Sequence, residues 1–315
     1  MTIAFIFPGQ GSQSVGMGKA LADTFAAARE VFGEVDEALG EKLTATMWDG
    51  PADRLTLTEN AQPALMAVSL AAMRVLEREA GLDLARDAAF VAGHSLGEYS
   101  ALAAVGALTV PDTARLLRIR GRAMQAAVPV GAGAMAALLG LELEAAAAIA
   151  AEAAQGQVCQ AANDNSGGQV VVSGDKAAVE RAVEIAKTKG ARRAMLLPVS
   201  APFHCALMQP AADAMAKALA QVEMRPPAIP LVANVLARPI SDPADIVTSL
   251  IAQVTGTVRW RESVAFMASA GVDSFYEVGA GKVLSGLVKR IAEGARGTAI
   301  GTPDDVAAFK AARAP

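Results

Sequence analysis

The segment from Ala88 to Leu108 constrains the fold of this 315-residue chain more than any other. It begins with an apolar run, AAFVAG, that is typical of a short buried strand, and it continues as SLGEYSALAAVGAL, which has helical character. A strand that passes through a tight turn into a helix is the unit from which α/β folds are built. The same alternation begins at Ile3 and resumes with the strand IPLVANV, so we expect a large α/β domain with a parallel sheet.

The middle of the chain has a different order of elements. GAMAALLGL reads as a strand, LEAAAAIAAEAA as a helix, VCQAANDNSGGQVVVSG as a hairpin that turns at 165–168, AAVERAVEIAKTKG as a helix and RRAMLLPVS as a strand. The order β-α-β-β-α-β is that of ferredoxin-like domains. We therefore expect a ferredoxin-like subdomain at 128–198, inserted in a core formed by 1–127 and 199–315.

The composition excludes several classes of protein. Hydrophobic residues make up 53% of the chain, which is enough for a full core, and the net charge of −4 gives no basic surplus for nucleic acid. No apolar run is long enough to cross a bilayer, and the start, MTIAFIFPGQ, has no charged region or cleavage signal. These features lead us to expect a cytoplasmic protein. Cys159 and Cys205 have no metal-site spacing, so we expect no metal.

Ser95 stands in the pattern G-x-S-x-G, between a predicted strand and a predicted helix. In that setting a serine hydroxyl is held exposed on a strained turn, and the main-chain N–H of Leu96 would face a developing oxyanion. The other interpretation is a serine that caps the helix, with glycines present for packing. The pattern alone does not separate the two.

A nucleophilic serine needs a general base, and the chain has only two histidines. His94 adjoins Ser95, and adjacent side chains diverge on a tight turn, so His94 is poorly placed. His204, in SAPFHCALM, is the remaining candidate; its alternative is a histidine at a helix N-terminus with local hydrogen bonds. No Asp or Glu stands out as a third member, so a main-chain or amide oxygen could orient the imidazole instead. Cys205 is more simply a small core residue than a nucleophile.

Arg120 falls on the apolar side of a predicted helix. Arg115, Arg118 and Arg122 share one face of DTARLLRIRGRAMQAA by their spacing, whereas Arg120 lies roughly opposite them beside Leu116 and Met124. A buried guanidinium requires an anion, and its fork matches a carboxylate. The partner is either an internal acidic residue or the free carboxylate of an acyl group held near Ser95.

A glycine-rich loop, FPGQGSQSVGMG, follows the first predicted strand. It lacks the third glycine of a dinucleotide fingerprint and the Lys-Ser/Thr of a phosphate-binding loop. It could bring the N–H of Gln10 to an oxyanion hole, or it could be a plain strand-to-helix turn.

Together these segments resemble the malonyl-CoA:acyl carrier protein transacylases. The resemblance covers nearly the whole chain. It rests on FPGQGSQ at 7–13, QPAL at 62–65, GHSLGEYSAL at 93–102, RGRAMQ at 120–125, PFHCALM at 202–208, Gln253, and EVGAGKVLSGLVKRI at 277–291. It implies an α/β-hydrolase-like core with a ferredoxin-like insert, and it implies a monomer.

By position, the resemblance implies a role for each motif residue. Ser95 would be the acylated nucleophile, His204 its base, and Gln253 the acceptor that orients His204. The N–H groups of Gln10 and Leu96 would form the oxyanion hole. The residues that would bind the acyl group are Arg120, which would pair with the malonyl carboxylate, and Gln62, Asn163 and Phe203, which would line the pocket. Transacylases of this family often have a small residue in place of Phe203, and this departure concerns acyl preference.

The implied reaction is ping-pong transfer of malonyl from malonyl-CoA to acyl carrier protein in fatty acid biosynthesis, without a cofactor. The carrier is acidic in this family, so a local basic patch would have to dock it. The candidates are Lys187, Lys189, Arg192 and Arg193 in the insert, and Lys282, Lys289 and Arg290 near the C-terminus.

Three other functions share some of these features. A serine hydrolase would have the same serine and histidine but would prefer water, and Arg120 argues against it. A non-catalytic carrier-binding module would not need Ser95, His204 and Arg120 together. An acyltransferase that serves a polyketide synthase would keep the chemistry and change only the carrier.

Overall fold

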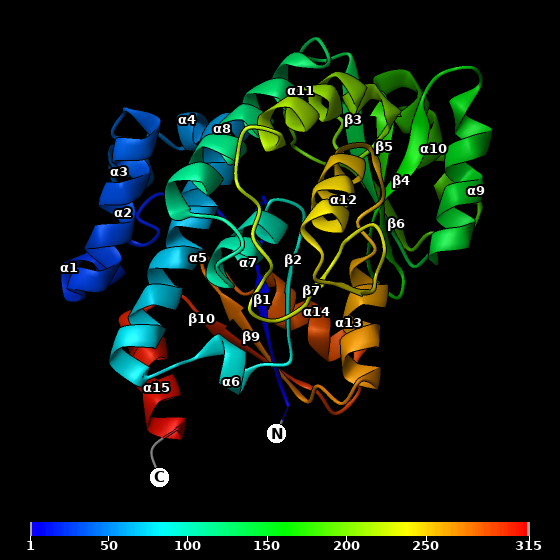
Figure 1. Cartoon of the computed structure of the whole chain (residues 1–315). Helices are drawn as coiled ribbons and strands as arrows, with labels where there is room; N and C mark the ends of the chain where they lie inside the picture. Colours follow the sequence, from blue (N-terminus) through cyan, green and yellow to red (C-terminus); the bar gives the residue numbers. More distant parts are fainter. Residues whose placement is uncertain (1, 314–315) are drawn as a thin grey trace.

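The computed structural model describes residues 2–313 and contains two sheets (Figure 1). The larger sheet has the order β10-β9-β1-β2-β7-β8, and all its neighbouring strands are parallel except β7 and β8. Its strands are β1 (Ile3–Phe7), β2 (Phe90–Gly93), β7 (Leu231–Val232), β8 (Pro239–Ile240), β9 (Ser274–Val278) and β10 (Arg296–Ile300). The predicted parallel α/β core is thereby confirmed.

The smaller sheet is antiparallel and has the order β4-β5-β3-β6. Its strands are β3 (Gly133–Leu139), β4 (Cys159–Ser166), β5 (Gln169–Asp175) and β6 (Arg193–Leu196). Helices α9 (Leu143–Ala154) and α10 (Lys176–Thr188) cover one face of it and enclose a separate small core (Figure 1). This is the ferredoxin-like arrangement that the element order predicted; the exact domain boundaries remain a prediction.

The remaining helices surround the larger sheet. They are α1 (Lys19–Thr24), α2 (Ala26–Leu39), α3 (Leu43–Asp49), α4 (Ala52–Thr56), α5 (Thr58–Ala80), α6 (Leu84–Asp87), α7 (Gly97–Ala104), α8 (Val110–Ala126), η1 (Ala206–Met208, a 3₁₀ turn), α11 (Gln209–Leu219), α12 (Pro243–Thr255), α13 (Trp260–Ser269), α14 (Val283–Ile291) and α15 (Pro303–Ala312). No helix within residues 2–313 is both long and apolar enough to cross a membrane.

Strand β1 explains why helices pack on both faces of the larger sheet. Successive side chains on a strand point to opposite faces. Phe5 and Phe7 join the core formed with α2, α5 and α8, whereas Ala4 and Ile6 join the core formed with α13 and α14. Every residue between Ala4 and Phe7 is therefore apolar and fully buried, as expected for a central parallel strand.

Helix α1 starts at Lys19, after the glycine-rich loop that follows β1. Gly16 and Gly18 have φ angles of 93° and 76°, which continue the loop after β1 instead of a helix. The carboxyl ends of β1 and β2 lie side by side, with Phe7 in register with Gly93. This edge of a parallel sheet is where α/β proteins place their ligands.

Candidate active site

Ser95 lies on a strained turn between β2 and α7. Its φ angle is 53°, in the left-handed region that a non-glycine residue rarely adopts. A Cβ atom on Gly93 would collide with the main chain of Gly97, and one on Gly97 would collide with the carbonyl of Phe7. Only glycine fits on either side of the turn, and the Ser95 Oγ atom contacts His204 and Arg120 instead of a main-chain N–H of α7. The geometry favours the exposed-hydroxyl interpretation of G-x-S-x-G over the helix cap.

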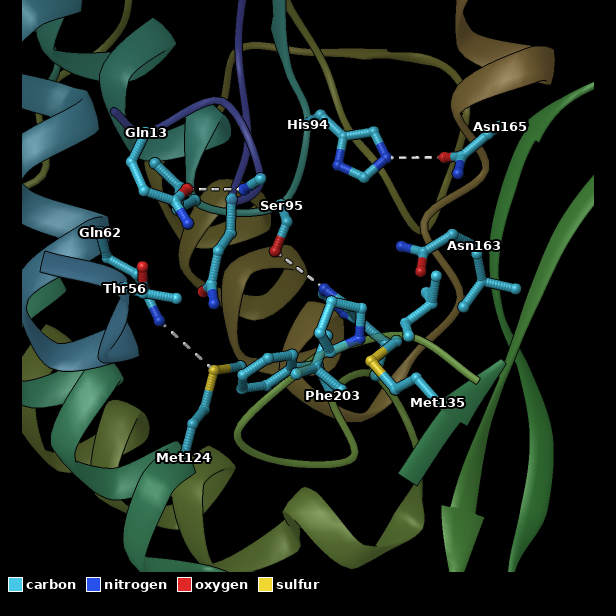
Figure 2. Close-up of a pocket in the computed structure, with 18 of the residues that line it drawn as sticks. Gln13, Thr56, Gln62, His94, Ser95, Met124, Met135, Asn163, Asn165 and Phe203 are labelled. Atoms are coloured by element: carbon cyan, nitrogen blue, oxygen red, sulfur yellow. Dashed lines mark hydrogen bonds between the residues drawn. The ribbon is translucent and has the colours of Figure 1, made fainter. Parts of the chain in front are cut away.

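His204 meets Ser95 across a sequence separation of 109 residues, and the Ser95 Oγ to His204 Nε2 distance is 2.8 Å (Figure 2). The other ring nitrogen, Nδ1, lies 2.8 Å from the main-chain carbonyl oxygen of Gln253. A carbonyl only accepts, so Nδ1 carries the hydrogen and Nε2 is free to accept the serine proton. The predicted orienting contact from Gln253 is thus present, and its main-chain oxygen makes it.

Burial, followed by the nearby Arg120 guanidinium, lowers the pKa of His204 to about 3. The imidazole is therefore neutral near pH 7, which is the form a general base needs. A carboxylate in place of the Gln253 carbonyl would oppose this effect, because it would stabilise the imidazolium.

Arg120 is buried, as its helical position predicted, and it lines the same cavity as Ser95 and His204. Its Nη1 donates to Gln62 Oε1 at 2.8 Å, and its Nη2 donates to Gln253 Oε1 at 2.7 Å and to Ser95 Oγ at 3.2 Å. Its guanidinium also lies 5.7 Å from the centre of the Tyr99 ring. Within residues 2–313 it forms no salt bridge, so the internal acidic partner that was one alternative is not in direct contact.

Arg118 was expected on the same helix face as Arg115 and Arg122. Arg115 and Arg122 are exposed, whereas Arg118 is buried against Asn60 and forms an ion pair with Glu41. It is the structural arginine of α8, and it contacts none of the residues around Ser95.

The cavity above Ser95 has a volume of about 310 Å³ and lies between the two sheets. It is lined by residues of both, and the predicted pocket residues among them are Gln10, Gln62, Leu96, Asn163 and Phe203. In Figure 2 the Asn163 amide and the Phe203 ring face the space around Ser95. Met124 and Met135 add flexible apolar walls.

The N–H groups of Gln10 and Leu96 have no acceptor within residues 2–313, although both residues border the cavity. Two unpaired main-chain donors beside a serine hydroxyl are the arrangement that an oxyanion hole requires. Gln10 follows β1 and Leu96 follows β2, so the adjacent carboxyl ends of these strands place them together.

The sequence reasoning missed two residues under the turn. Asn234 accepts from the Ser95 N–H at 2.8 Å and donates to the Gly93 carbonyl at 2.7 Å, so one amide holds both sides of the turn. Glu98 is fully buried and accepts from the Asn234 N–H and from the Gln253 side chain. Burial raises the pKa of Glu98 to about 7. Glu98 lies within the motif GHSLGEYSAL on which the family resemblance rests, whereas nothing near Asn234 marked that residue.

His94 and Cys205 do not compete with the dyad. The His94 Nε2 lies 2.8 Å from Asn165 Oδ1 of the smaller sheet (Figure 2), and the ring packs against Trp260. The Cys205 thiol is buried and donates to the Pro202 carbonyl at 3.2 Å, and burial raises its pKa. A thiol in this state is a poor nucleophile.

Comparison with known proteins identifies the family. The profile of the acyl transferase domain matches residues 4–303. The malonyl CoA-acyl carrier protein transacylase of Escherichia coli (strain K12) is 47% identical over 305 residues, which are 97% of each chain. The chain belongs to the malonyl CoA-acyl carrier protein transacylases.

Solved structures of transacylases have the same fold. The acyl-carrier-protein-S-malonyltransferase of Bartonella henselae is 57% identical, with a TM-score of 0.96 over 98% of both chains. A malonyl-transacylase solved in complex with a type II polyketide acyl-carrier protein is 41% identical, with a TM-score of 0.95 over 99% of this chain and all of that one. The family and fold expected from the motifs are therefore confirmed.

Proposed function

We propose that this transacylase moves the malonyl group of malonyl-CoA to the phosphopantetheine thiol of acyl carrier protein, through a malonyl ester on Ser95, in fatty acid biosynthesis. One observation carries the proposal: a serine–histidine pair shares its cavity with a buried arginine that has no carboxylate partner in residues 2–313. The dyad supports acyl transfer, and the arginine supports an acyl group that ends in a carboxylate.

In the first half-reaction the Ser95 hydroxyl attacks the thioester carbonyl and gives its proton to His204 Nε2. The carbonyl oxygen becomes negative and receives hydrogen bonds from the N–H groups of Gln10 and Leu96. When the carbon–sulfur bond breaks, the CoA sulfur takes the proton from His204, which leaves a neutral base and malonyl on Ser95.

In the second half-reaction the carrier thiol gives its proton to His204, and its sulfur attacks the ester carbonyl. The carbon–oxygen bond breaks, and Ser95 recovers its proton from the imidazolium. The acyl group leaves as a new thioester, so the enzyme returns to its starting state without any other reactant.

Arg120 supplies the preference for malonyl. Its Nη2 is 3.2 Å from Ser95 Oγ, so a carboxylate one carbon beyond an ester carbonyl on Ser95 would lie within reach of the guanidinium. Gln62 and Gln253 hold the guanidinium through neutral oxygens, which leaves its charge available to the substrate.

The carrier would dock on basic side chains near the cavity. Lys187 and Lys189 of the predicted patch pair with Glu184 and Glu152, so they offer little free charge. Arg192 and Arg193 are exposed and make no salt bridge within residues 2–313. Their neighbourhood is the better candidate, because it carries positive charge that is not already paired.

Arg290 extends this surface. It donates to Gln169 at 3.3 Å, and the Arg192 side chain lies beside Gly168, so two arginines that are far apart in sequence flank the same β4–β5 turn. Arg192, Arg193 and Arg290 are named the turn patch below. The β4–β5 turn closely follows Asn165, which lines the cavity.

The transfer assay tests the function directly. Malonyl-CoA and holo carrier protein are mixed with the enzyme, and the carrier mass is followed; Ser95→Ala should abolish the gain of malonyl. A polyketide carrier is the second candidate acceptor, because one similar transacylase was solved with such a partner. Competition between a fatty-acid carrier and a polyketide carrier for one malonyl-enzyme separates the two pathways.

A further inference from the structure

Two glutamine amides hold Arg120, and each amide must face one way. Gln62 and Gln253 both present their Oε1 atoms to the guanidinium, at 2.8 and 2.7 Å. The oxygen and nitrogen ends of an amide have nearly the same size, so packing alone does not choose between them. A flipped amide would set its NH₂ group against the N–H groups of the guanidinium, and the arginine would lose that contact.

Three acceptors fix the Gln253 amide. Its Nε2 faces the Ser95 carbonyl at 2.9 Å, the Asn234 Oδ1 atom at 3.3 Å, and the Glu98 carboxylate. Because the Ser95 carbonyl and the Asn234 Oδ1 atom can only accept from this nitrogen, the oxygen of Gln253 is turned toward Arg120.

The Gln62 amide depends on one hydroxyl. Its Nε2 donates to Thr58 Oγ1 at 2.8 Å, and its only other acceptor in residues 2–313 is the Met124 sulfur at 3.6 Å (Figure 2), which is a weak one. Thr58 is fully buried at the first residue of α5, one helical turn before Gln62. The i, i+4 spacing puts the two side chains on the same face of the helix.

Arg120 and Thr58 require the same orientation of the Gln62 amide. A guanidinium only donates, so Gln62 gives it an oxygen and must turn its nitrogen to Thr58. The Thr58 hydroxyl has a single hydrogen, which it donates to the Gln10 Oε1 atom at 2.8 Å, so it can only accept from Gln62 and holds the Gln62 nitrogen on its side. Thr58 thereby connects the arginine to the loop whose Gln10 N–H faces the cavity.

We infer that Thr58 is a positioning residue for the acyl transfer, whose hydroxyl fixes the Gln62 amide toward Arg120 and ties the Gln10 loop to the same network. The inference rests on the proposed role of Arg120 as the partner of the malonyl carboxylate. Thr58 touches no reacting atom. Its loss lets the Gln62 amide rotate, which removes one of the two contacts that aim the guanidinium.

Thr58→Val tests this, because valine keeps the shape of threonine and lacks the hydroxyl. Single-turnover loading of Ser95 is measured by mass spectrometry with malonyl-CoA and, separately, with acetyl-CoA. We expect the second-order rate constant for malonyl loading to fall about tenfold more than that for acetyl loading, since the hydrogen bond from the charged Arg120 to Gln62 is lost. Thr58→Ser, which restores the hydroxyl, should return the ratio to that of the wild type.

Thr113→Val is the matched control. Thr113 is also fully buried, and its hydroxyl donates to a main-chain carbonyl, that of Thr109, at 2.7 Å. Its loss should leave the malonyl-to-acetyl ratio unchanged. Thr58→Ala is a second route to the same deletion if the valine variant does not fold, and circular dichroism establishes folding for each variant.

The outcomes separate this inference from the proposed function. If wild type forms no malonyl-Ser95, or if Arg120→Met keeps full malonyl loading, the proposed function fails first. If both of those behave as proposed and Thr58→Val or Thr58→Ala lowers malonyl and acetyl loading equally, or lowers neither, the positioning role of Thr58 is overturned.

Discussion

Replacing Arg120 with methionine should remove most of the preference for malonyl over acetyl groups, so that the enzyme loads both at similar rates. The side chain is almost wholly buried, and within residues 2–313 its hydrogen-bond partners are neutral oxygens of Gln62, Gln253 and Ser95. A substrate carboxylate would therefore be the anion that completes the site. Methionine has a similar length and no charge.

The magnitude follows from the cost of leaving that carboxylate without a partner. Removing one member of a buried ion pair costs about 3–5 kcal/mol. Since about 1.4 kcal/mol corresponds to a factor of ten, malonyl loading should fall roughly 10²- to 10⁴-fold. Acetyl loading should change by less than about tenfold, because an acetyl group makes no ion pair and the dyad stays in place.

The assay is single-turnover acylation of Ser95, followed by intact-protein mass spectrometry, with malonyl-CoA and acetyl-CoA in parallel. Arg122→Met is the control, since Arg122 lies on the same helix, is exposed, and pairs with Glu59. Arg120→Lys should give an intermediate result, because it keeps the charge and loses the planar fork. Equal losses for both acyl groups in Arg120→Met would refute the reasoning and would assign the guanidinium to the geometry of Ser95 instead.

Three further predictions concern protonation and docking. Because burial raises the pKa of Glu98 from 4.5 to about 7, the folded protein holds a proton between these pH values that the unfolded chain releases, so this group's contribution to stability is lost as pH rises. The loss amounts to about 3 kcal/mol; Glu98→Gln should lack it, and urea unfolding curves of variant and wild type that shift in parallel between pH 5 and 8 would contradict this. The pKa of His204 is lowered to about 3, so its imidazole NMR signals should keep the neutral form down to pH 5, and a titration midpoint near 6.5 would be incompatible with the burial described. Charge reversal of Arg192 and Arg193 in the turn patch should raise the KM for carrier protein and leave the KM for malonyl-CoA unchanged. Charge reversal of the exposed Lys310 of α15 should alter neither KM. An unchanged KM for carrier protein would show that the turn patch does not dock the carrier.

The sequence was sufficient to predict those features of the site that depend on residues close together along the chain. The glycines around Ser95 predicted a tight turn, and the structure gives their reason, since neither Gly93 nor Gly97 has room for a Cβ atom. Helical spacing placed Arg120 on the apolar side of α8, and Arg120 is buried. Because the chain has only two histidines, His204 could be predicted as the general base without any knowledge of the fold.

The sequence was not sufficient where contacts join distant segments. Gln253 and the Ser95 carbonyl are 158 residues apart, and Asn234 and the Ser95 N–H are 139 apart. No periodicity extends over such distances, so the network beneath the turn was invisible. The burial of Arg118 was equally invisible in the sequence, because its partners Glu41 and Asn60 come from segments far from α8 along the chain.

The most direct test of the account is the fate of the acyl group on Ser95. Wild type and Ser95→Ala are mixed with malonyl-CoA and measured as intact proteins over time, before and after addition of holo carrier protein. The account predicts a single malonyl adduct on wild type, none on Ser95→Ala, and movement of the adduct to the carrier. Steady release of CoA without an adduct, or an adduct that water removes before any thiol is added, would contradict it and indicate a hydrolase.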